Sequence, residues 1–231
     1  MTLRLASYNI RKALGTDRRR DPRRTCTVIA ALDADAVVLQ EADLRLGPRP
    51  TALPAAEIAG LTGLVPAELG QSARSLGWHG NAILLRPGIP VTALHRHHLP
   101  GLEPRGCVAA DLQTAIGPLR VVGAHLGLLR ASRRLQLVAI LEMLSRLPPM
   151  PTVIAGDFNE WSRRTGLGRL THGAFTVHAP GRSFHSRRPV AALDRIATSE
   201  GLRLTQSGVW AAPPAPHASD HLPIWAELAG A

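Results

Sequence analysis

The sequence of 231 residues is poor in cysteine, lysine and aromatic residues, and each shortage argues against a class of protein. Its two cysteines, Cys26 and Cys107, are far apart and follow no metal-ligand spacing, so neither a disulfide scaffold nor a thiolate zinc site is expected. Aromatic residues are 3% of the chain, too few for a groove that stacks bases along a single nucleic-acid strand. No apolar run approaches membrane-spanning length. We therefore expect two reduced core cysteines and no transmembrane helix.

Several catalytic signatures are also missing. The chain has no GxSxG turn, which makes acyl transfer by a serine nucleophile a weaker interpretation. It has neither a GxGxxG nor a GxxxxGK[ST] loop, so the common glycine-rich nucleotide sites are not indicated.

The formal charge of +10 comes almost entirely from arginine, because Lys12 is the only lysine. Such a charge is typical of proteins that bind nucleic acid or membranes, but it is equally compatible with a compositional bias of a chain rich in alanine, leucine and arginine. We expect most arginine clusters to be solvated and one or two to bind phosphate. The clusters are Arg18-Arg19-Arg20, Arg23-Arg24, Arg133-Arg134, Arg163-Arg164 and Arg187-Arg188.

No linker or composition shift divides the chain, so residues 1–231 are predicted to form one domain. The first strand starts almost at residue 1, which leaves no room for a signal peptide. We expect a cytoplasmic protein, or one held peripherally at a membrane, that is monomeric and needs no obligate protein partner.

Hydrophobic periodicity predicts more strands than helices, in consecutive runs, which favours packed sheets flanked by helices. One helix is expected over Cys26–Leu32. A second should begin at an N-cap at Ser132 and present Leu135, Val138, Leu141 and Leu144 to a sheet, ending before Pro148. The segment 44–75 shows a short helix near 54–59 and no recognisable chemistry. Strands are predicted at 81–85, 91–97, 107–113 and 119–126, besides those named below.

Six predicted apolar strands begin or end in polar side chains that a core has no reason to hold. Convergence of these ends on one edge would make a cleft. The residues are Asn9, Glu41, His125, Asp157 with Asn159, Asp194, and Asp220 with His221.

Glu41 follows the apolar run Val37–Leu39, where an unpaired carboxylate is costly to desolvate. A cation would offset that cost, although an ordinary surface glutamate is an even alternative. Carboxylate and amide oxygens without thiolates favour Mg²⁺, with Mn²⁺ as a substitute.

The other polar ends suit proton transfer and phosphate binding. Asp194 is the candidate that orients His221, and a carboxylate partner tunes the basicity of an imidazole. Together with Asn159 and His125, these residues could activate water and offset charge on a phosphoryl group. The pattern predicts metal-assisted phosphoester hydrolysis.

In this order the motifs resemble the endonuclease/exonuclease/phosphatase superfamily, which includes pancreatic deoxyribonuclease, abasic-site endonucleases, neutral sphingomyelinases and inositol polyphosphate phosphatases. The resemblance covers nearly the whole chain, and the ordered series of motifs is far more specific than any single motif. The motifs are SYNIR, LQEAD, GNAILLR with Asn81, GAHLG, GDFNEW, ALDRI and SDHLP.

The resemblance implies an α+β fold, a four-layer α/β/β/α sandwich in which two packed mixed β-sheets are flanked by helices. It implies a divalent ion held chiefly by Glu41 with Asn9 nearby, and Asp220 joining a metal site. Asp157 and Asn159 would orient the nucleophile and phosphate, Asp194 would pair with His221, and His125 would contact the phosphate or act as an acid. Secondary candidates for lining the phosphate pocket are His79, Asn81 and Arg105.

The expected partner is a phosphodiester substrate. The resemblance does not decide whether this substrate is nucleic acid or a phospholipid headgroup. The scarcity of aromatic and apolar wedges disfavours sequence-selective nuclease action, but a nuclease that only cuts the backbone needs neither. A phosphomonoesterase is an alternative, and so is a non-catalytic phosphate-binding protein. The filled acidic and imidazole positions argue against the last.

Overall fold

Two mixed six-stranded β-sheets form the centre of the computed structural model, which describes residues 1–162, 166–172 and 174–230. The first sheet has the order β11-β12-β1-β2-β4-β3, and the second has the order β5-β6-β7-β8-β10-β9. The first comprises β11 (Leu202–Val209), β12 (Ile224–Gly230), β1 (Leu3–Asn9), β2 (Ala36–Gln40), β4 (Ala82–Leu85) and β3 (Val65–Pro66). The second comprises β5 (Val91–Leu99), β6 (Arg105–Thr114), β7 (Gly117–His125), β8 (Thr152–Asp157), β10 (Asp194–Ser199) and β9 (Phe175–His178).

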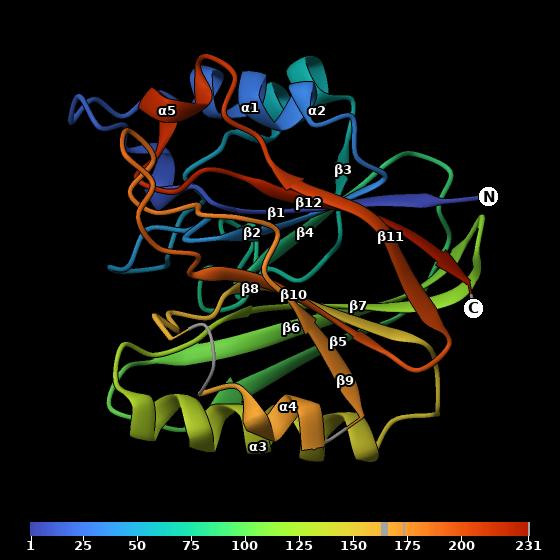
Figure 1. The fold of residues 1–231 in the computed structure, drawn as a ribbon. Coiled ribbons are helices and arrows are strands. Elements are labelled where there is room, and N and C mark those ends of the chain that lie inside the picture. Colours follow the sequence, from blue (N-terminus) through green and yellow to red (C-terminus); the bar gives the residue numbers. More distant parts are fainter. Residues whose placement is uncertain (163–165, 173, 231) are drawn as a thin grey trace.

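Helices cover the outer face of each sheet (Figure 1). On one side lie α1 (Pro22–Ala31), α2 (Ala55–Thr62) and α5 (Ala215–Ala218), and on the other α3 (Arg130–Ser145) and α4 (Gly168–His172). The expected α+β fold, a four-layer α/β/β/α sandwich, is confirmed.

Strand alternation explains the three cores. In β2, Val38 points into the core between the sheets, whereas Val37 and Leu39 pack under the helices, because successive side chains face opposite ways. Ile140 of α3 and Ile154 of β8 belong to the third core, on the outer face of the second sheet. Both faces of the central strands are buried, so their sequences are continuously apolar.

The predicted strands and the short helix near 54–59 match the structure closely, but the other two predicted helices need correction. The first, α1, begins at Pro22 rather than Cys26, because Asp21 caps it by accepting a hydrogen bond from the Arg24 N–H at 2.9 Å. The residues of the first turn are polar, so the spacing of apolar residues does not reveal where the helix begins.

The N-cap of α3 is Leu129, and Ser132 lies buried within the helix. The predicted apolar face is confirmed in part: Leu141 and Leu144 pack against the third core, but Leu135 is exposed. The fully buried positions of the helix include Gln136, Leu137 and Ile140, which were not predicted. A strict three-residue repeat drifts around a helix of 3.6 residues per turn, so its members cannot all lie on the buried face.

The arginine clusters differ in environment. Arg24 pairs with Asp17, but Arg133, expected to be solvated, is buried and its Nη2 lies 3.0 Å from Oε2 of Glu160. Arg163 and Arg164 lie outside the described residues. No helix in the described ranges is long and apolar enough to cross a membrane.

Candidate active site

Strand register places three predicted site residues side by side at one edge of the second sheet. Parallel pairing of β7 with β8 sets His125 opposite Asp157, and antiparallel pairing of β8 with β10 sets Asp194 opposite Asp157. Opposed residues of neighbouring strands point to the same face. The sheet therefore presents an imidazole and two carboxylates as one row.

The first sheet contributes to the same point through β1. Asn9 ends this strand, and its Nδ2 donates a hydrogen bond to Oδ2 of Asp157 at 3.0 Å. The same carboxylate oxygen lies 3.3 Å from Nε2 of His125 and 3.6 Å from Nε2 of His221. One oxygen of Asp157 is thus surrounded by an amide and two imidazoles, from both sheets.

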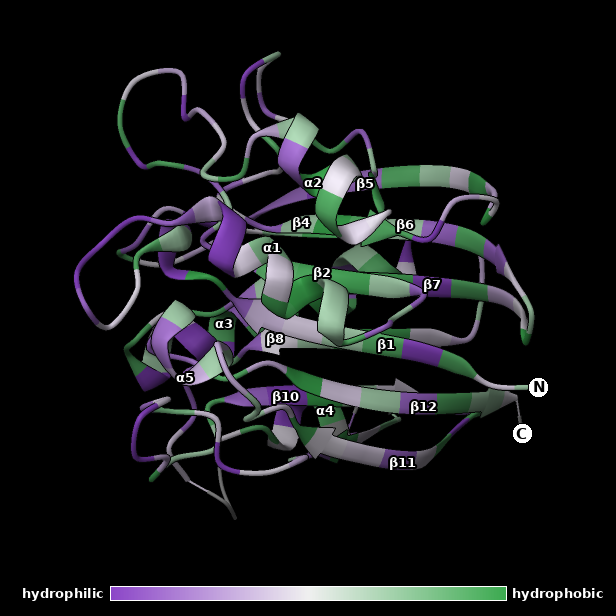
Figure 2. Cartoon of the chain, turned by 90° about the horizontal axis from the view of Figure 1, so that it is seen from above, coloured by the Kyte–Doolittle hydropathy of each residue, from purple (hydrophilic) through white to green (hydrophobic). Residues whose placement is uncertain are grey.

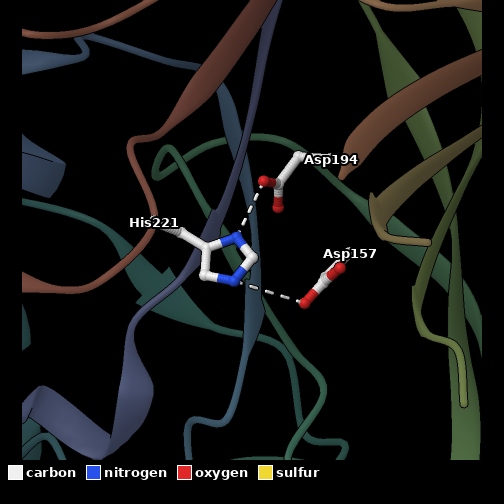
Figure 3. Close-up of side chains that lie close together, drawn as sticks. All are labelled: Asp157, Asp194 and His221. Carbon is white, nitrogen blue, oxygen red and sulfur yellow. Dashed lines mark hydrogen bonds and ion pairs between the residues drawn. The ribbon is translucent and has the colours of Figure 1, made fainter. Parts of the chain in front are cut away.

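His221 lies between two carboxylates (Figure 3). Its Nδ1 donates to Oδ2 of Asp194 at 2.9 Å, while Nε2 faces Asp157. The hydroxyl of Ser183 also donates to Oδ2 of Asp194, and the ring of Phe184 packs on the imidazole with centroids 5.0 Å apart. These contacts hold the ring in one orientation, with Nε2 directed into the site.

The two histidines have opposite protonation preferences. Burial lowers the pKa of His125 to about 3, with only partial compensation from Asp157. Burial also opposes charge on His221, but the carboxylates of Asp194 and Asp157 outweigh it and raise the pKa of His221 to about 10. Near neutral pH the site therefore pairs a neutral imidazole with an imidazolium.

Asn159 lies beyond the end of β8, so strand alternation does not place it. Its backbone adopts a left-handed φ of 50°, its N–H donates to Oδ1 of Asp157 at 3.0 Å, and its Nδ2 donates to the carbonyl of Leu126 at 2.9 Å. A non-glycine residue in this conformation is held by its surroundings, which is common at functional sites. Asn159 thereby ties the turn after β8 to the end of β7.

Glu41, just after β2, is also left-handed, with φ of 54°, and forms an ion pair with Lys12. Lys12 lies in the turn η1 (Arg11–Ala13), in which all three residues have positive φ. Lys12 is the only lysine of the sequence, and no motif around it indicated a role. The turn places its ammonium at the carboxylate that was predicted to bind a metal.

A cavity of about 150 Å³ adjoins Glu41 and His125. The segment 44–75, in which no chemistry was recognised, supplies Arg45 and Arg49 to its wall. The predicted residues His79 and Arg105 also line it, as does Glu103, whose Oε2 accepts a hydrogen bond from Nη2 of Arg105 at 2.6 Å. Cationic side chains thus line the approach to the site.

Two further predicted residues, Asn81 and Asp220, are not among those that line this cavity. Asn81 is buried and its Nδ2 donates to the carbonyl of Gly106 at 2.9 Å, which links the start of β4 to β6. Asp220 carries an ion pair from Oδ2 to Nε of Arg11 at 3.3 Å. Asp43, which was not predicted, lines the cavity, and burial raises its pKa to about 6 against the hydrogen bonds from the Leu76 and Gly77 N–H groups.

The donor atoms at this edge suit a hard divalent ion. Asp157, Asp194 and His221 each offer a ligand atom within 4.8 Å of the others, and Oδ1 of Asp194 is buried without a hydrogen-bond partner in the described part of the chain. A cation would satisfy such an oxygen. This group differs from the predicted set of Asn9, Glu41 and Asp220, whose donors are all oxygens. Its imidazole binds an ion only after losing a proton, which the raised pKa of His221 opposes near neutral pH.

Solved structures share this architecture. An endonuclease/exonuclease/phosphatase family protein of Bacteroides thetaiotaomicron superposes with a TM-score of 0.78 at 18% identity, covering 99% of this chain and 97% of that one. A mannosyl-6-phosphatase of Bacteroides thetaiotaomicron VPI-5482 gives 0.75 at 20%, covering 98% and 99%. An endonuclease/exonuclease/phosphatase of Beutenbergia cavernae DSM 12333 gives 0.75 at 21%, covering 99% and 72%.

A search of the curated proteins gives no match. The model of the endonuclease/exonuclease/phosphatase family matches residues 6–221, a span that contains every site residue described above. Members of this family are hydrolases that act on phosphoesters and use divalent metals. The ordered motifs, the two packed sheets and the polar edge agree with that match, and the chain belongs to the endonuclease/exonuclease/phosphatase family.

Proposed function

We propose that the protein is a divalent-metal-dependent phosphodiesterase that hydrolyses its substrate by in-line attack of an activated water. The observation that carries the proposal is the arrangement around Oδ2 of Asp157, where Asn9, His125 and His221 converge from three segments far apart in sequence. Buried carboxylates and imidazoles in hydrogen-bond contact are the usual parts of acid–base catalysis.

A divalent ion, when bound, offsets the negative charge that develops on the phosphoryl oxygens. Glu41 would hold it, with Asn9 and Asp220 nearby, because this carboxylate lies at the cavity and its one described ion pair is with Lys12. The predicted ion is Mg²⁺, with Mn²⁺ as a substitute.

The protein's own side chains supply proton transfer, positive charge and hydrogen bonds to the phosphate. Asp157 accepts the proton of the attacking water, and Asn159 keeps the Asp157 carboxylate in place through its backbone N–H. His221, kept protonated by Asp194, offers positive charge and an Nε2–H to the phosphate. His125 is neutral near pH 7, so it offers a hydrogen bond rather than a charge. Arg105 and His79 line the same cavity and, in this proposal, bind a phosphate oxygen.

Hydrolysis of bis(p-nitrophenyl) phosphate tests the proposal, because this soluble diester needs no further recognition. We expect activity with Mg²⁺, none with chelator, and a loss of about 10²–10⁴-fold in kcat for Asp157→Asn. His172→Gln is the matched control, since His172 is exposed on α4 outside the site. Full activity of Asp157→Asn would refute the assignment.

A phosphomonoesterase is the second candidate, favoured by the cationic wall. Arg45, Arg49 and Arg105 line one cavity, and a terminal phosphate carries more negative charge than a diester. One similar structure is a mannosyl-6-phosphatase. A faster Mg²⁺-dependent turnover of p-nitrophenyl phosphate than of the diester would select this candidate.

A further inference from the structure

Most of the large apolar side chains that the structure leaves exposed lie at the active-site edge. Six of them, each 53% to 86% exposed, form what we call the apolar rim: Leu46, Leu102, Leu128, Leu129, Trp161 and Val190. An exposed apolar side chain is ordinary when it stands alone, but a group around a site marks an interaction surface.

Sheet topology places the whole rim at one end of the molecule. Leu46 follows β2, Leu128 and Leu129 follow β7, and Trp161 follows β8, all beyond strand ends that carry site residues. Leu102 lies in the loop between β5 and β6, just before Arg105, and Val190 lies in the loop before β10. In Figure 2 the long loops at the end away from the marked termini carry green stretches between purple ones.

Hydrogen bonds connect the rim loops to one another and to the site. The Leu128 N–H donates to Oε1 of Glu103 at 2.9 Å, which joins the loops that carry Leu102 and Leu128. Trp161 packs edge-on against Phe184, with centroids 6.0 Å apart, and Phe184 in turn packs on His221. The Val190 N–H donates to the carbonyl of Phe184 at 2.6 Å. These contacts join the loops of Leu102 and Leu128 to each other and connect Trp161 and Val190 to the site through Phe184.

The charges of the rim are positive. Its acidic side chains Glu103 and Glu160 pair with Arg105 and Arg133. Four exposed arginines lie within three residues of a rim residue in sequence and form no ion pair within the described ranges: Arg45, Arg130, Arg187 and Arg188. Exposed aliphatic side chains next to unpaired guanidinium groups are complementary to a lipid bilayer, which has an apolar interior and anionic phosphates at its surface.

We propose that the apolar rim docks onto an anionic phospholipid bilayer, so that the active-site cavity faces a lipid headgroup phosphoester. Nucleic acid is the less suitable occupant, because five of the six rim side chains are aliphatic and stack poorly on bases. In its choice of substrate the inference rests on the proposed phosphoesterase function. Hydrolysis would add water across one P–O bond, giving an alcohol and a phosphate ester, without a further reactant.

Co-sedimentation with vesicles tests the docking separately from catalysis. We expect the full chain, in chelator, to bind vesicles of equal phosphatidylglycerol and phosphatidylcholine, and to bind phosphatidylcholine alone more weakly. The variant Leu46→Ser/Leu102→Ser/Leu128→Ser should lose about tenfold or more in partition. Removing charge in Arg130→Gln/Arg187→Gln/Arg188→Gln should cost about fivefold per arginine at low salt.

A matched control lies at the opposite edge, where Val65 and Val91 are exposed at the distant ends of β3 and β5. Val65→Ser/Val91→Ser should bind vesicles like the natural chain, and each serine variant should keep its hydrolysis of the soluble diester. Equal vesicle binding by the rim variant and the natural chain would overturn the proposal. So would a rim variant that loses only retention on duplex DNA, or one that only converts a dimer to a monomer in sedimentation equilibrium.

The two proposals fail in different ways. Vesicle binding without hydrolysis of any phosphoester would retain the docking surface and refute the proposed function. Hydrolysis of the soluble diester without vesicle binding would retain the function and refute the docking surface.

Discussion

The two sheets contribute differently to the active-site edge. The part at β7, β8 and β10 is closed, since Asp157, Asp194 and His221 are all buried, with His221 hydrogen-bonded to Asp194 and 3.6 Å from Asp157. The part after β1 and β2 is open, and the side chains of Lys12 and Glu41 are 21% and 18% exposed. Proton transfer needs fixed distances, whereas an ion and a substrate must enter and leave. Within the proposed function, we therefore assign proton transfer to the closed part and ligand binding to the open part.

The largest effect is expected from breaking the closed part at Asp194. Asp194→Asn removes the charge that raises the pKa of His221, so the imidazole loses its proton at lower pH. We expect kcat to fall about 10²–10⁴-fold and the alkaline limb of the pH–rate profile to move to lower pH. Ser183→Ala is the milder control, because it removes a neutral donor to the same carboxylate. An unshifted alkaline limb in Asp194→Asn would contradict the role given to His221.

Breaking the open part at Glu41 should affect metal binding rather than proton transfer. We expect Glu41→Gln to lower Mg²⁺ affinity by at least about tenfold, because a neutral amide replaces an anionic ligand. Titration calorimetry measures this directly, and Mn²⁺ binding followed by electron paramagnetic resonance provides a second readout. Unchanged affinity in Glu41→Gln would shift the ion to the group formed by Asp157, Asp194 and His221.

Lys12 sharpens the comparison, because its effect on metal binding should have the opposite sign. Lys12→Met removes the ammonium that pairs with Glu41, so Mg²⁺ affinity should rise about fivefold. In chelator the variant should lose about 1–2 kcal/mol of its free energy of unfolding, since the carboxylate is left without a partner. Saturating Mg²⁺ should restore that stability in urea unfolding. A fall in Mg²⁺ affinity would show that Lys12 supports the ion rather than competing with it.

The two histidines of the closed part predict opposite pH dependences of stability. The pKa of His221 rises from 6.5 to about 10 on folding, so its contribution is complete below 6.5 and is lost as pH rises toward 10. The pKa of His125 falls from 6.5 to about 3, so its contribution is present above 6.5 and is lost as pH falls toward 3. Each slope is at most about 1.4 kcal/mol per pH unit.

Urea unfolding in chelator measures both slopes. His221→Gln should flatten the alkaline loss of stability, and His125→Gln the acid loss, relative to the natural chain at the same pH. His172→Gln again serves as the control. Identical pH profiles in all four proteins would contradict both shifts.

Sequence reasoning succeeded where the information is local. Asn9, His125 and Asp157 were predicted as strand ends, and each ends its strand in the structure. It failed where the face of an element depends on what packs against it. Ser132 looked like an N-cap but is buried within α3, and Arg133 looked solvated but pairs with Glu160. The wall residues Arg45 and Arg49 lie in a loop without a motif, and only the fold brings them to Glu41.

The sequence by itself determined which polar residue types lie at the predicted strand ends, because strand alternation and termination are encoded by neighbouring residues. Its ordered motifs also carried the resemblance that implied the fold. The tertiary structure alone decided which of these side chains meet. Asn9 and Asp157 are 148 residues apart, and their hydrogen bond exists because both sheets end at the same edge. The protonation of His125 and His221 was decided there too, since a pKa depends on burial and on charges that distant segments bring within a few ångströms.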